Sequence, residues 1–139
     1  MIQTSSSTQH LVADFIETIW NQRRFDRLDE YIHPAFTDHS LPPPLPRDIH
    51  GLEQWIRLTG QSFEHHTVID DQVSEPEKSI LKIRLLVKHI GEWRGIPPTG
   101  LEVQAAGFRC FHLEDGRIIG HWALVDGNGI EKQLIAHQR

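Results

Sequence analysis

The sequence predicts an α+β fold, in which three N-terminal helices pack in the mouth of a strongly curved antiparallel β-sheet. Two observations support this prediction. Apolar residues recur at helical spacing through the first half of the chain, and they alternate with polar residues through the second half. The 139 residues contain no internal repeat and no interdomain linker, so we expect one domain over residues 1–139.

The first half contains three candidate helices. An apolar stripe over residues 11–20 marks the first, and the Ser and Thr residues before it are candidate N-caps. The second covers residues 25–32 and should stop at Pro34, because proline cannot continue a helix. The third begins at Gly51 and fades near residues 65–66. Together these segments predict an amphipathic helical layer.

After residue 67 the apolar period changes to two, which predicts strands. We expect strands over residues 68–73, 79–90, 101–113 and 117–126, the last two joined at Asp115-Gly116. One face of the second strand carries a regular series: Leu81, Ile83, Leu85, Val87 and His89. Helices followed by a meander of strands indicate a sheet that wraps around the helices.

Composition excludes several classes of protein. The net charge is −5 and Lys and Arg do not cluster, so nucleic acid and anionic membranes are not expected partners. No apolar run approaches the roughly 20 residues needed to cross a bilayer. Cys110 is the only cysteine, which excludes an internal disulfide, and residues 1–7 do not resemble a signal peptide. We therefore expect a cytoplasmic protein.

The stretch from Gly91 to Gly100 contains the loop Gly-Ile-Pro-Pro-Thr-Gly, which follows a strand ending in His89. A further strand, an acidic-Gly turn and the pair His121-Trp122 come after it, and Asp126 closes the series. This order resembles the SnoaL-like polyketide cyclases, also called ester cyclases, over residues 11–134. The resemblance implies a cone-shaped fold related to nuclear transport factor 2, a small-molecule pocket and a homodimer.

The turn of the last hairpin decides which side chains share a face. A two-residue turn at 115–116 leaves Asp126 on the face of Trp122 but separates it from His112. A three-residue loop over 114–116 with a bulge puts all three side chains on one face. Spacing leaves both open. The resemblance favours the three-residue loop, because family members place a His and an Asp at these two positions inside one pocket.

Asp126 is the predicted catalyst. It follows the apolar residues 122–125, so we expect a strand end to hold it at a cavity wall, where poor solvation raises the pKa of a carboxyl group. It could then take a proton from carbon and return one to oxygen. His112 is the predicted partner, polarising a carbonyl or positioning Asp126. The alternatives are a capping Asp before residues 127–129 and an edge His at a hairpin end.

Five further residues are candidate substrate-binding groups. His89 should point into the core or cavity, and the resemblance places a His there, although a satisfied core His is the simpler explanation. By resemblance, His39 lies at the pocket mouth, and Trp20 lines the pocket unless it is purely a core residue. Trp93 could form a lid over an aromatic ligand, and Trp122 belongs to the His-Trp pair of the family.

Two features limit the chemistry. The family commonly has an Asp after its His-Trp pair, whereas this chain has Ala123, so either an Asp farther along the strand acts or activity is lost. We prefer the first explanation. The ten histidines lack the His-Glu-x-x-His spacing, and the adjacent residues 65–66 would diverge on a helix, so we predict no metal site.

The predicted function is that of a polyketide or ester cyclase, or a related isomerase. It would act without a cofactor on a small hydrophobic carbonyl compound, by acid/base chemistry of the intramolecular aldol type. The alternatives are a non-catalytic small-molecule-binding module, or a hydrolase or dehydratase whose water His89 and His39 would hold. The sequence does not identify the substrate.

Overall fold

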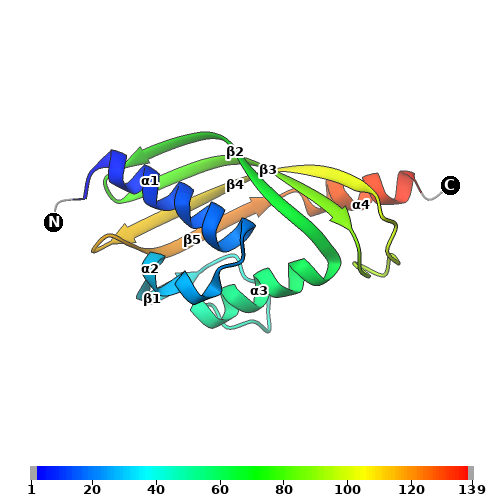
Figure 1. The fold of residues 1–139 in the computed structure, drawn as a ribbon, viewed down its shortest axis with the longest axis horizontal. Helices are drawn as coiled ribbons and strands as arrows, with labels where there is room; N and C mark the ends of the chain where they lie inside the picture. The colour runs from blue at the N-terminus through cyan, green and yellow to red at the C-terminus, as the bar shows by residue number, and fades with distance from the viewer. Residues whose placement is uncertain (1–2, 138–139) are drawn as a thin grey trace.

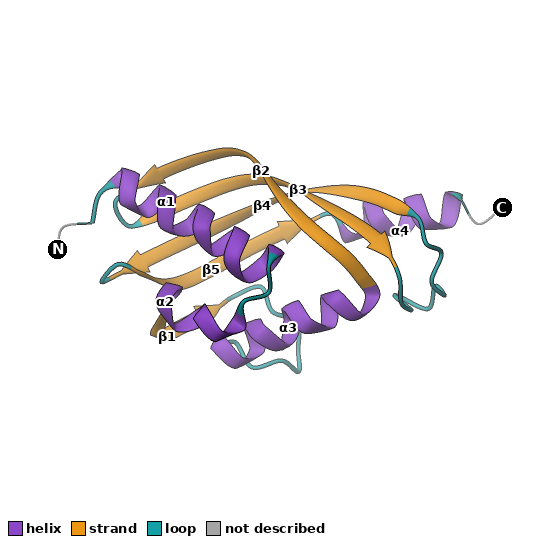
Figure 2. Ribbon diagram, in the orientation of Figure 1, coloured by secondary structure: helices purple, strands orange, loops and turns teal. Residues whose placement is uncertain are grey.

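The computed structural model describes residues 3–137, which form four α-helices and one five-stranded sheet (Figures 1 and 2). The α-helices are α1 (Ser5–Phe15), α2 (Leu28–Tyr31), α3 (Ile49–Ser62) and α4 (Gly127–Ala136). A π-helical turn, η1 (Ile16–Asn21), extends α1, and a 3₁₀ turn, η2 (Phe25–Arg27), precedes α2. The strands are β1 (Ile32–Asp38), β2 (Phe63–Glu75), β3 (Lys78–His89), β4 (Glu102–Glu114) and β5 (Arg117–Val125).

The sheet has the strand order β1-β5-β4-β3-β2. The four long strands pair antiparallel, as predicted, while β1 adds to the edge parallel to β5. The second helix ends at Tyr31, before Pro34, and the chain then continues directly as β1. A proline is tolerated in β1 because an edge strand need not donate every backbone N–H to a neighbour.

One face of the sheet, which we call the inner face, is covered by helices. In Figure 1, α1, α2 and α3 lie on the same side of the sheet, and α4 lies at the end away from the N-terminus. The alternating series on β3 from Leu81 to His89 is buried, as predicted. Inner-face residues of β3 and β4 pack with α1 and α3 into one apolar core. The opposite side is called the outer face.

One local expectation needs correction, and one helix was not predicted. The third helix ends at Ser62, so His65 and His66 lie in β2 and not on a helix. Neighbouring side chains on a strand point to opposite faces, and His65 is accordingly half-buried while His66 is exposed. The structure also has a C-terminal helix, α4, which buries Ile130 and Leu134 against inner-face residues of β3 and β4.

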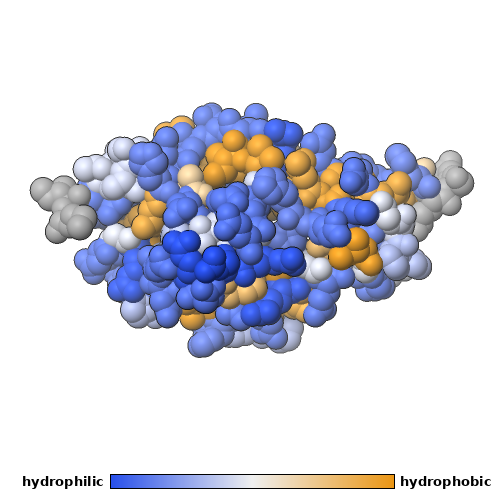
Figure 3. Space-filling model, viewed as in Figure 1, coloured by the Kyte–Doolittle hydropathy of each residue, from blue (hydrophilic) through white to orange (hydrophobic). Residues whose placement is uncertain are grey.

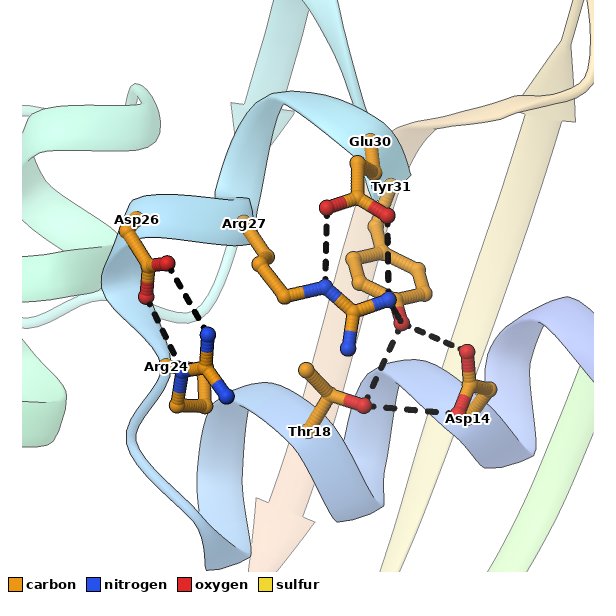
Figure 4. Close-up of polar contacts among 7 residues, drawn as sticks. All are labelled: Asp14, Thr18, Arg24, Asp26, Arg27, Glu30 and Tyr31. Carbon is orange, nitrogen blue, oxygen red and sulfur yellow. Dashed lines mark hydrogen bonds and ion pairs between the residues drawn. The ribbon is translucent and has the colours of Figure 1, made fainter.

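Polar side chains fasten α1 to α2 (Figure 4). The hydroxyl of Tyr31 donates to Asp14 and lies 3.2 Å from the hydroxyl of Thr18. Arg27 binds both carboxylate oxygens of Glu30, at 2.8 and 3.0 Å. The bonds of Tyr31 therefore join α2 to α1 and η1, whereas the Arg27–Glu30 pair lies within the η2–α2 segment.

The π-helical turn positions Trp20. A π turn is wider than an α turn and often marks a functional segment, and here Ile16, Thr18, Ile19 and Trp20 are all buried. The side chain of Asn21 bonds both the N–H and the C=O of Thr67 in β2, at 2.8 and 3.0 Å. These two bonds tie the turn to the sheet and fix Trp20 above the inner face.

The surface seen in Figure 3 is mainly hydrophilic, and its apolar areas are separated from one another. Within residues 3–137, no helix has both the length and the apolar character that a membrane crossing requires.

Candidate functional site

The turn of the last hairpin differs from the preferred prediction. Glu114 pairs with Arg117, and Asp115 and Gly116 have φ angles of 52° and 74°. Two central residues with positive φ define a type I′ turn of two residues, so the three-residue loop is wrong. A bulge at Ile119 follows, because His112 pairs with Gly120 while Leu113 pairs with Ile118. The extra residue restores the alternation that the three-residue loop would have produced.

His112 and Trp122 consequently share a face, as predicted, but it is the outer face. Their ring centroids lie 4.7 Å apart, and His39 stacks on the other side of Trp122 at 4.3 Å. His39 and Trp122 are exposed and His112 is half-buried. The expectations that His112 faces a pocket and that His39 lines a cavity with Trp20 are therefore wrong. The three rings form an aromatic cluster on the surface.

Asp126 is exposed and not held at a cavity wall. It is the N-cap of α4, and its Oδ1 accepts the backbone N–H of Gly129 at 2.8 Å. The strand does end just before it, at Val125, but the chain turns there into a helix that the sequence did not predict. The catalytic role of Asp126 stays a prediction, and the geometry gives this carboxylate a capping role.

His89 points inward, as predicted, and is fully buried. Its Nδ1 accepts the backbone N–H of Thr99 at 3.2 Å and lies 3.1 Å from the Thr99 hydroxyl. Its ring packs 5.4 Å from that of Phe63. These contacts fasten the end of the Gly91–Gly100 loop to β3.

The inner face holds two adjacent cavities, of about 550 and 260 Å³. Four residues line both of them: Trp20, Trp55, Arg109 and Val125. The larger cavity extends to Phe63 and Trp93, and the smaller to Asp38 and His121. Of the candidate binding residues, Trp20 and Trp93 therefore lie at a cavity.

Trp93 reaches the larger cavity from the 91–100 loop. Its ring packs edge-on against Phe63 at 5.2 Å, and the guanidinium of Arg94 lies 4.5 Å from its centroid. Arg94 also donates to Asn128 at 2.9 Å and lies 3.7 Å from Glu131, so the loop is joined to α4. The loop and the start of α4 thus border the cavity together.

Three polar residues form a buried chain beside the smaller cavity. The Nδ1 of His121 lies 2.9 Å from Oδ2 of Asp38, and its Nε2 lies 3.3 Å from Nη1 of Arg109. A guanidinium can only donate, so Nε2 of His121 accepts and the ring proton sits on Nδ1, which donates to Asp38. The three side chains are 1%, 4% and 5% exposed for Asp38, His121 and Arg109, respectively.

Burial and pairing set the charges of the three side chains Asp38, His121 and Arg109. Burial lowers the pKa of His121, which keeps the ring neutral, although the bond to Asp38 acts in the opposite direction. Burial alone would raise the pKa of Asp38, but the hydrogen bond and charge of its neighbours outweigh this and lower it. Burial lowers the pKa of Arg109 to about 10. At neutral pH the chain is therefore carboxylate, neutral imidazole and guanidinium.

Trp20 lies between Arg109 and a fourth polar residue, His65. The guanidinium of Arg109 lies 4.4 Å from the centroid of the Trp20 ring, a cation–π contact, and the ring of His65 meets Trp20 edge-on at 6.0 Å. Burial lowers the pKa of His65 to about 4, and the charges of Arg23 and Arg109 add to this effect. His65 is therefore a neutral group on the inner face.

Sequence reasoning did not single out Asp38, Arg109 or His121 as functional. One signal was available for Arg109, because it has the same parity in its strand as the apolar residues Phe111 and Leu113. A charged residue on an apolar face is an informative exception. Asp38 and His121 lie 83 residues apart and meet only because β1 pairs with β5.

Among residues 3–137, one group of side chains has ligand atoms close enough for a metal: His33, Glu114 and Asp115, all within 4.8 Å of one another. Both carboxylates are exposed. Exposed acidic groups of this kind are common without an ion, and the group lies at the hairpin turn. It is not part of the buried chain.

Comparison with known proteins identifies the family. A family model described as SnoaL-like polyketide cyclase matches residues 10–134. The nogalonic acid methyl ester cyclase of Streptomyces nogalater is 29% identical over 124 residues, which cover 83% of this chain and 88% of the relative. The aklanonic acid methyl ester cyclase AcmA of Streptomyces galilaeus is 26% identical over 124 residues, which cover 83% and 82%.

Solved structures agree with this match. TsrD from Streptomyces laurentii superposes with a TM-score of 0.79 at 27% identity, over 93% of this chain and 95% of that chain. A polyketide cyclase-like structure from Acidithiobacillus ferrooxidans has a TM-score of 0.83 at 21% identity, over 95% and 96%, and shows the shared fold. The chain has the fold related to nuclear transport factor 2 and belongs to the SnoaL-like polyketide cyclase family.

Proposed function

We propose that this protein is a cyclase whose acid/base group is the buried His121–Asp38 pair. The observation that carries the proposal is the chain from Asp38 through His121 to Arg109 at the cavity wall. A carboxylate that accepts the Nδ1 proton of an imidazole fixes its tautomer and stabilises the imidazolium that forms when Nε2 takes a proton. The pair would therefore move a proton at Nε2 once the hydrogen bond from Arg109 opens, because that bond occupies the Nε2 lone pair in the resting structure.

The proposed reaction is an intramolecular aldol closure. His121 Nε2 takes a proton from the carbon α to a carbonyl, and the resulting enolate carbon attacks a second carbonyl carbon of the same molecule. A C–C bond forms while the C=O π pair moves to oxygen, and the alkoxide recovers the proton from His121. The product is an isomer of the substrate. Because burial lowers the pKa of His121, its imidazolium returns the proton readily.

Arg109 would stabilise the oxyanion that develops at each stage. It lies next to His121 and lines both cavities, so an oxygen bound to its free donors would be close to the proton-transfer atom. Donors held in place before the reaction stabilise developing charge without reorganisation, and one such donor typically contributes about 2.7 to 4 kcal/mol.

The cavity walls support a hydrophobic, aromatic substrate. Trp20, Trp55, Trp93 and Phe63 line the larger cavity, whose volume of about 550 Å³ suits a small organic molecule. Flat aromatic walls can also hold a flexible chain folded, which removes part of the entropic cost of ring closure. The relatives named for nogalonic and aklanonic acid methyl esters make such compounds reasonable test substrates.

The test uses those two methyl esters and the corresponding free acids. We expect wild-type protein to convert at least one of these compounds into a product of unchanged mass and changed chromatographic retention. In D₂O that compound should also gain deuterium at the carbon α to a carbonyl faster than without protein. Deuterium uptake without ring closure would support the proton transfer but require another substrate. If neither occurs with any enolisable substrate of this class, the cyclase proposal is wrong.

A second function, non-catalytic binding of a small molecule, also has an observation in its favour. Ala123, which lines the smaller cavity, carries no ionisable group, and Asp126 is exposed. A binding module would bind the same aromatic compounds but leave them unchanged. The D₂O experiment separates the two functions, because binding alone does not exchange a carbon-bound proton.

We also propose a homodimer that forms through the outer face of the sheet. Five apolar side chains there are at least one-third exposed: Val73, Ile80, Phe108, Trp122 and Leu124. We call them the outer-face patch. They are cross-strand neighbours, with Val73 opposite Ile80 and Phe108 opposite Leu124. Contiguous exposed apolar residues of this kind typically mark an interaction surface.

Sedimentation velocity tests the dimer. Wild-type protein should sediment at twice the mass of the 16.1 kDa chain, and a variant combining Phe108→Lys with Leu124→Lys should sediment as a monomer. Ile135→Lys is the matched control, because Ile135 is 49% exposed but lies on α4. A monomeric wild type, or a dimer that survives the double substitution, would contradict the proposal.

A further inference from the structure

Arg109 is buried without a carboxylate partner. Its guanidinium offers five N–H donors. Within the described part of the chain it makes one hydrogen bond, from Nη1 to His121, and its buried Nε has no partner. The charge of Asp38 acts on the guanidinium, but His121 lies between the two side chains. A buried cation in this situation is costly unless something else pairs with it.

Other arginines of the chain show what a paired guanidinium looks like. Arg24 and Arg27 each use Nε and Nη2 to bind both oxygens of one carboxylate, as Figure 4 shows. Both are on the helical side, and Arg24 is exposed. In Arg109, Nη1 is bonded to His121, so the Nε–Nη2 edge is the edge left for a carboxylate. That edge is the one that binds carboxylates bidentately.

The residue opposite Arg109 leaves room for such a group. In the β4–β5 register Arg109 pairs with Ala123, and both residues line the smaller cavity. Directly opposed residues on one sheet face have Cβ atoms about 4.5 to 5.5 Å apart. An Asp at position 123 would place a carboxylate beside the guanidinium, whereas the methyl group of Ala123 leaves that space to a ligand.

We propose that Arg109 binds a carboxylate on an aromatic ligand, so that this chain takes a free acid where its curated relatives are named for methyl esters. The proposal rests on the proposed function, because it assigns the ligand class of the same cavity. Trp20 holds the guanidinium from one side, and the carboxylate takes the place that an acidic residue 123 would occupy. The ring system of the ligand then lies along Trp20 and Trp55.

The binding test uses a matched pair of probes, anthraquinone-2-carboxylate and its methyl ester. They share one aromatic ring system and differ in charge at a single group. Isothermal titration calorimetry at pH 7.5 should show wild-type protein binding the carboxylate about 10- to 100-fold more tightly than the ester, because a paired carboxylate makes charge-assisted bonds that an ester cannot make.

Variants at position 123 test the site without removing Arg109. Ala123→Asp supplies an internal partner for the guanidinium, so it should weaken carboxylate binding by about tenfold or more and change ester binding by less than about threefold. Ala123→Asn has the same shape without the charge and should keep most of the carboxylate preference. Arg109→Gln should abolish the preference, and thermal melting must show that each variant is folded.

Three results would overturn the proposal. The first is equal affinity of wild-type protein for the two probes. The second is an equal loss of carboxylate binding in Ala123→Asp and Ala123→Asn, which would indicate a steric effect. The third is a folded Arg109→Gln that keeps the preference.

The carboxylate-binding proposal and the cyclase proposal can be contradicted independently of each other. Carboxylate-selective binding without ring closure or deuterium uptake would sink the cyclase proposal and leave this inference standing. Ring closure of methyl esters with no preference between the probes would contradict this inference and leave the cyclase proposal standing.

Discussion

The two faces of the β4–β5 hairpin carry similar residues in opposite settings. On the inner face, His121 is buried between Asp38 and Arg109 and has a fixed tautomer. On the outer face, His112 is half-buried and its ring rests on Trp122. Both faces thus present a His next to an aromatic or charged group. Only the inner one combines exclusion of water with a carboxylate partner and a cavity.

The face of the sheet to which a histidine side chain points therefore decides whether it can act as an acid/base group. The buried environment of His121 lowers the pKa of its ring. Desolvation keeps the His121 ring neutral and its bond to Asp38 orients it, so Nε2 faces Arg109 at the cavity. Matched substitutions on the two faces test whether His121 acts and His112 does not.

The largest expected effect is on turnover. His121→Gln removes the proton-transfer atom and should lower the rate of ring closure by about 10²- to 10⁴-fold, with little change in the affinity of the aromatic ligand. Asp38→Asn should lower the rate as well, because the imidazolium loses its counter-charge. Steady-state kinetics on whichever substrate the wild type converts would measure both effects.

His112→Gln is the matched outer-face control. It should retain the wild-type rate within about threefold, since His112 contacts Trp122 and not the cavity. If His112→Gln lost as much rate as His121→Gln, the inner-face assignment would be wrong.

A second contrast lies on β2, where His65 faces in and His66 faces out. The pKa of His65 is lowered to about 4 from its usual 6.5, so the folded state resists protonation that the unfolded state accepts. The folded protein should therefore lose stability as the pH falls from about 6.5 to about 4. After allowance for partial exposure, we expect this group to account for about 1 to 2 kcal/mol of the acid-induced loss.

Urea unfolding at pH 7.5 and pH 4.5 measures that loss. His65→Gln should reduce the difference between the two free energies of unfolding, and His66→Gln should leave it close to the wild-type value. An identical pH dependence in wild type and His65→Gln would show that His65 is protonated in the folded protein.

A smaller effect is expected at Asp126, whose contribution is capping. Asp126→Ala removes the side-chain acceptor for the Gly129 N–H and should cost about 1 kcal/mol of stability. Asp126→Asn keeps an acceptor and a good N-cap residue, so its stability should lie close to that of the wild type. Thermal melts of the two variants separate the contribution of the capping hydrogen bond to stability from that of the negative charge. Equal stability of Asp126→Ala and wild type would contradict the capping role.

The parts that sequence predicted well depend on one uninterrupted pattern. The inward orientation of His89 follows from the alternation that begins at Leu81, and no bulge intervenes. The helical layer likewise follows from apolar spacing, and the type I′ turn did not disturb either element. These features needed only local information.

The features that the sequence did not predict depend on turn type, on a bulge and on pairing between elements distant in the sequence. A type I′ turn and a G1-bulged loop both place a left-handed Gly at 116, so the sequence could not choose between them. The bulge at Ile119 then set the parity of β5. The meeting of Asp38 with His121 required the parallel β1–β5 pairing, and the helix after Val125 turned Asp126 into a cap.

Turnover by Asp126→Asn distinguishes the two possible sites of proton transfer, the buried His121–Asp38 pair and the carboxylate of Asp126. The substitution preserves the cap and removes only the ionisable group. If His121 and Asp38 carry the proton, Asp126→Asn closes the ring at the wild-type rate within about threefold. A folded Asp126→Asn slowed by about 10²-fold or more, as removal of an acid/base group predicts, would place the catalyst at Asp126 and contradict the inner-face assignment.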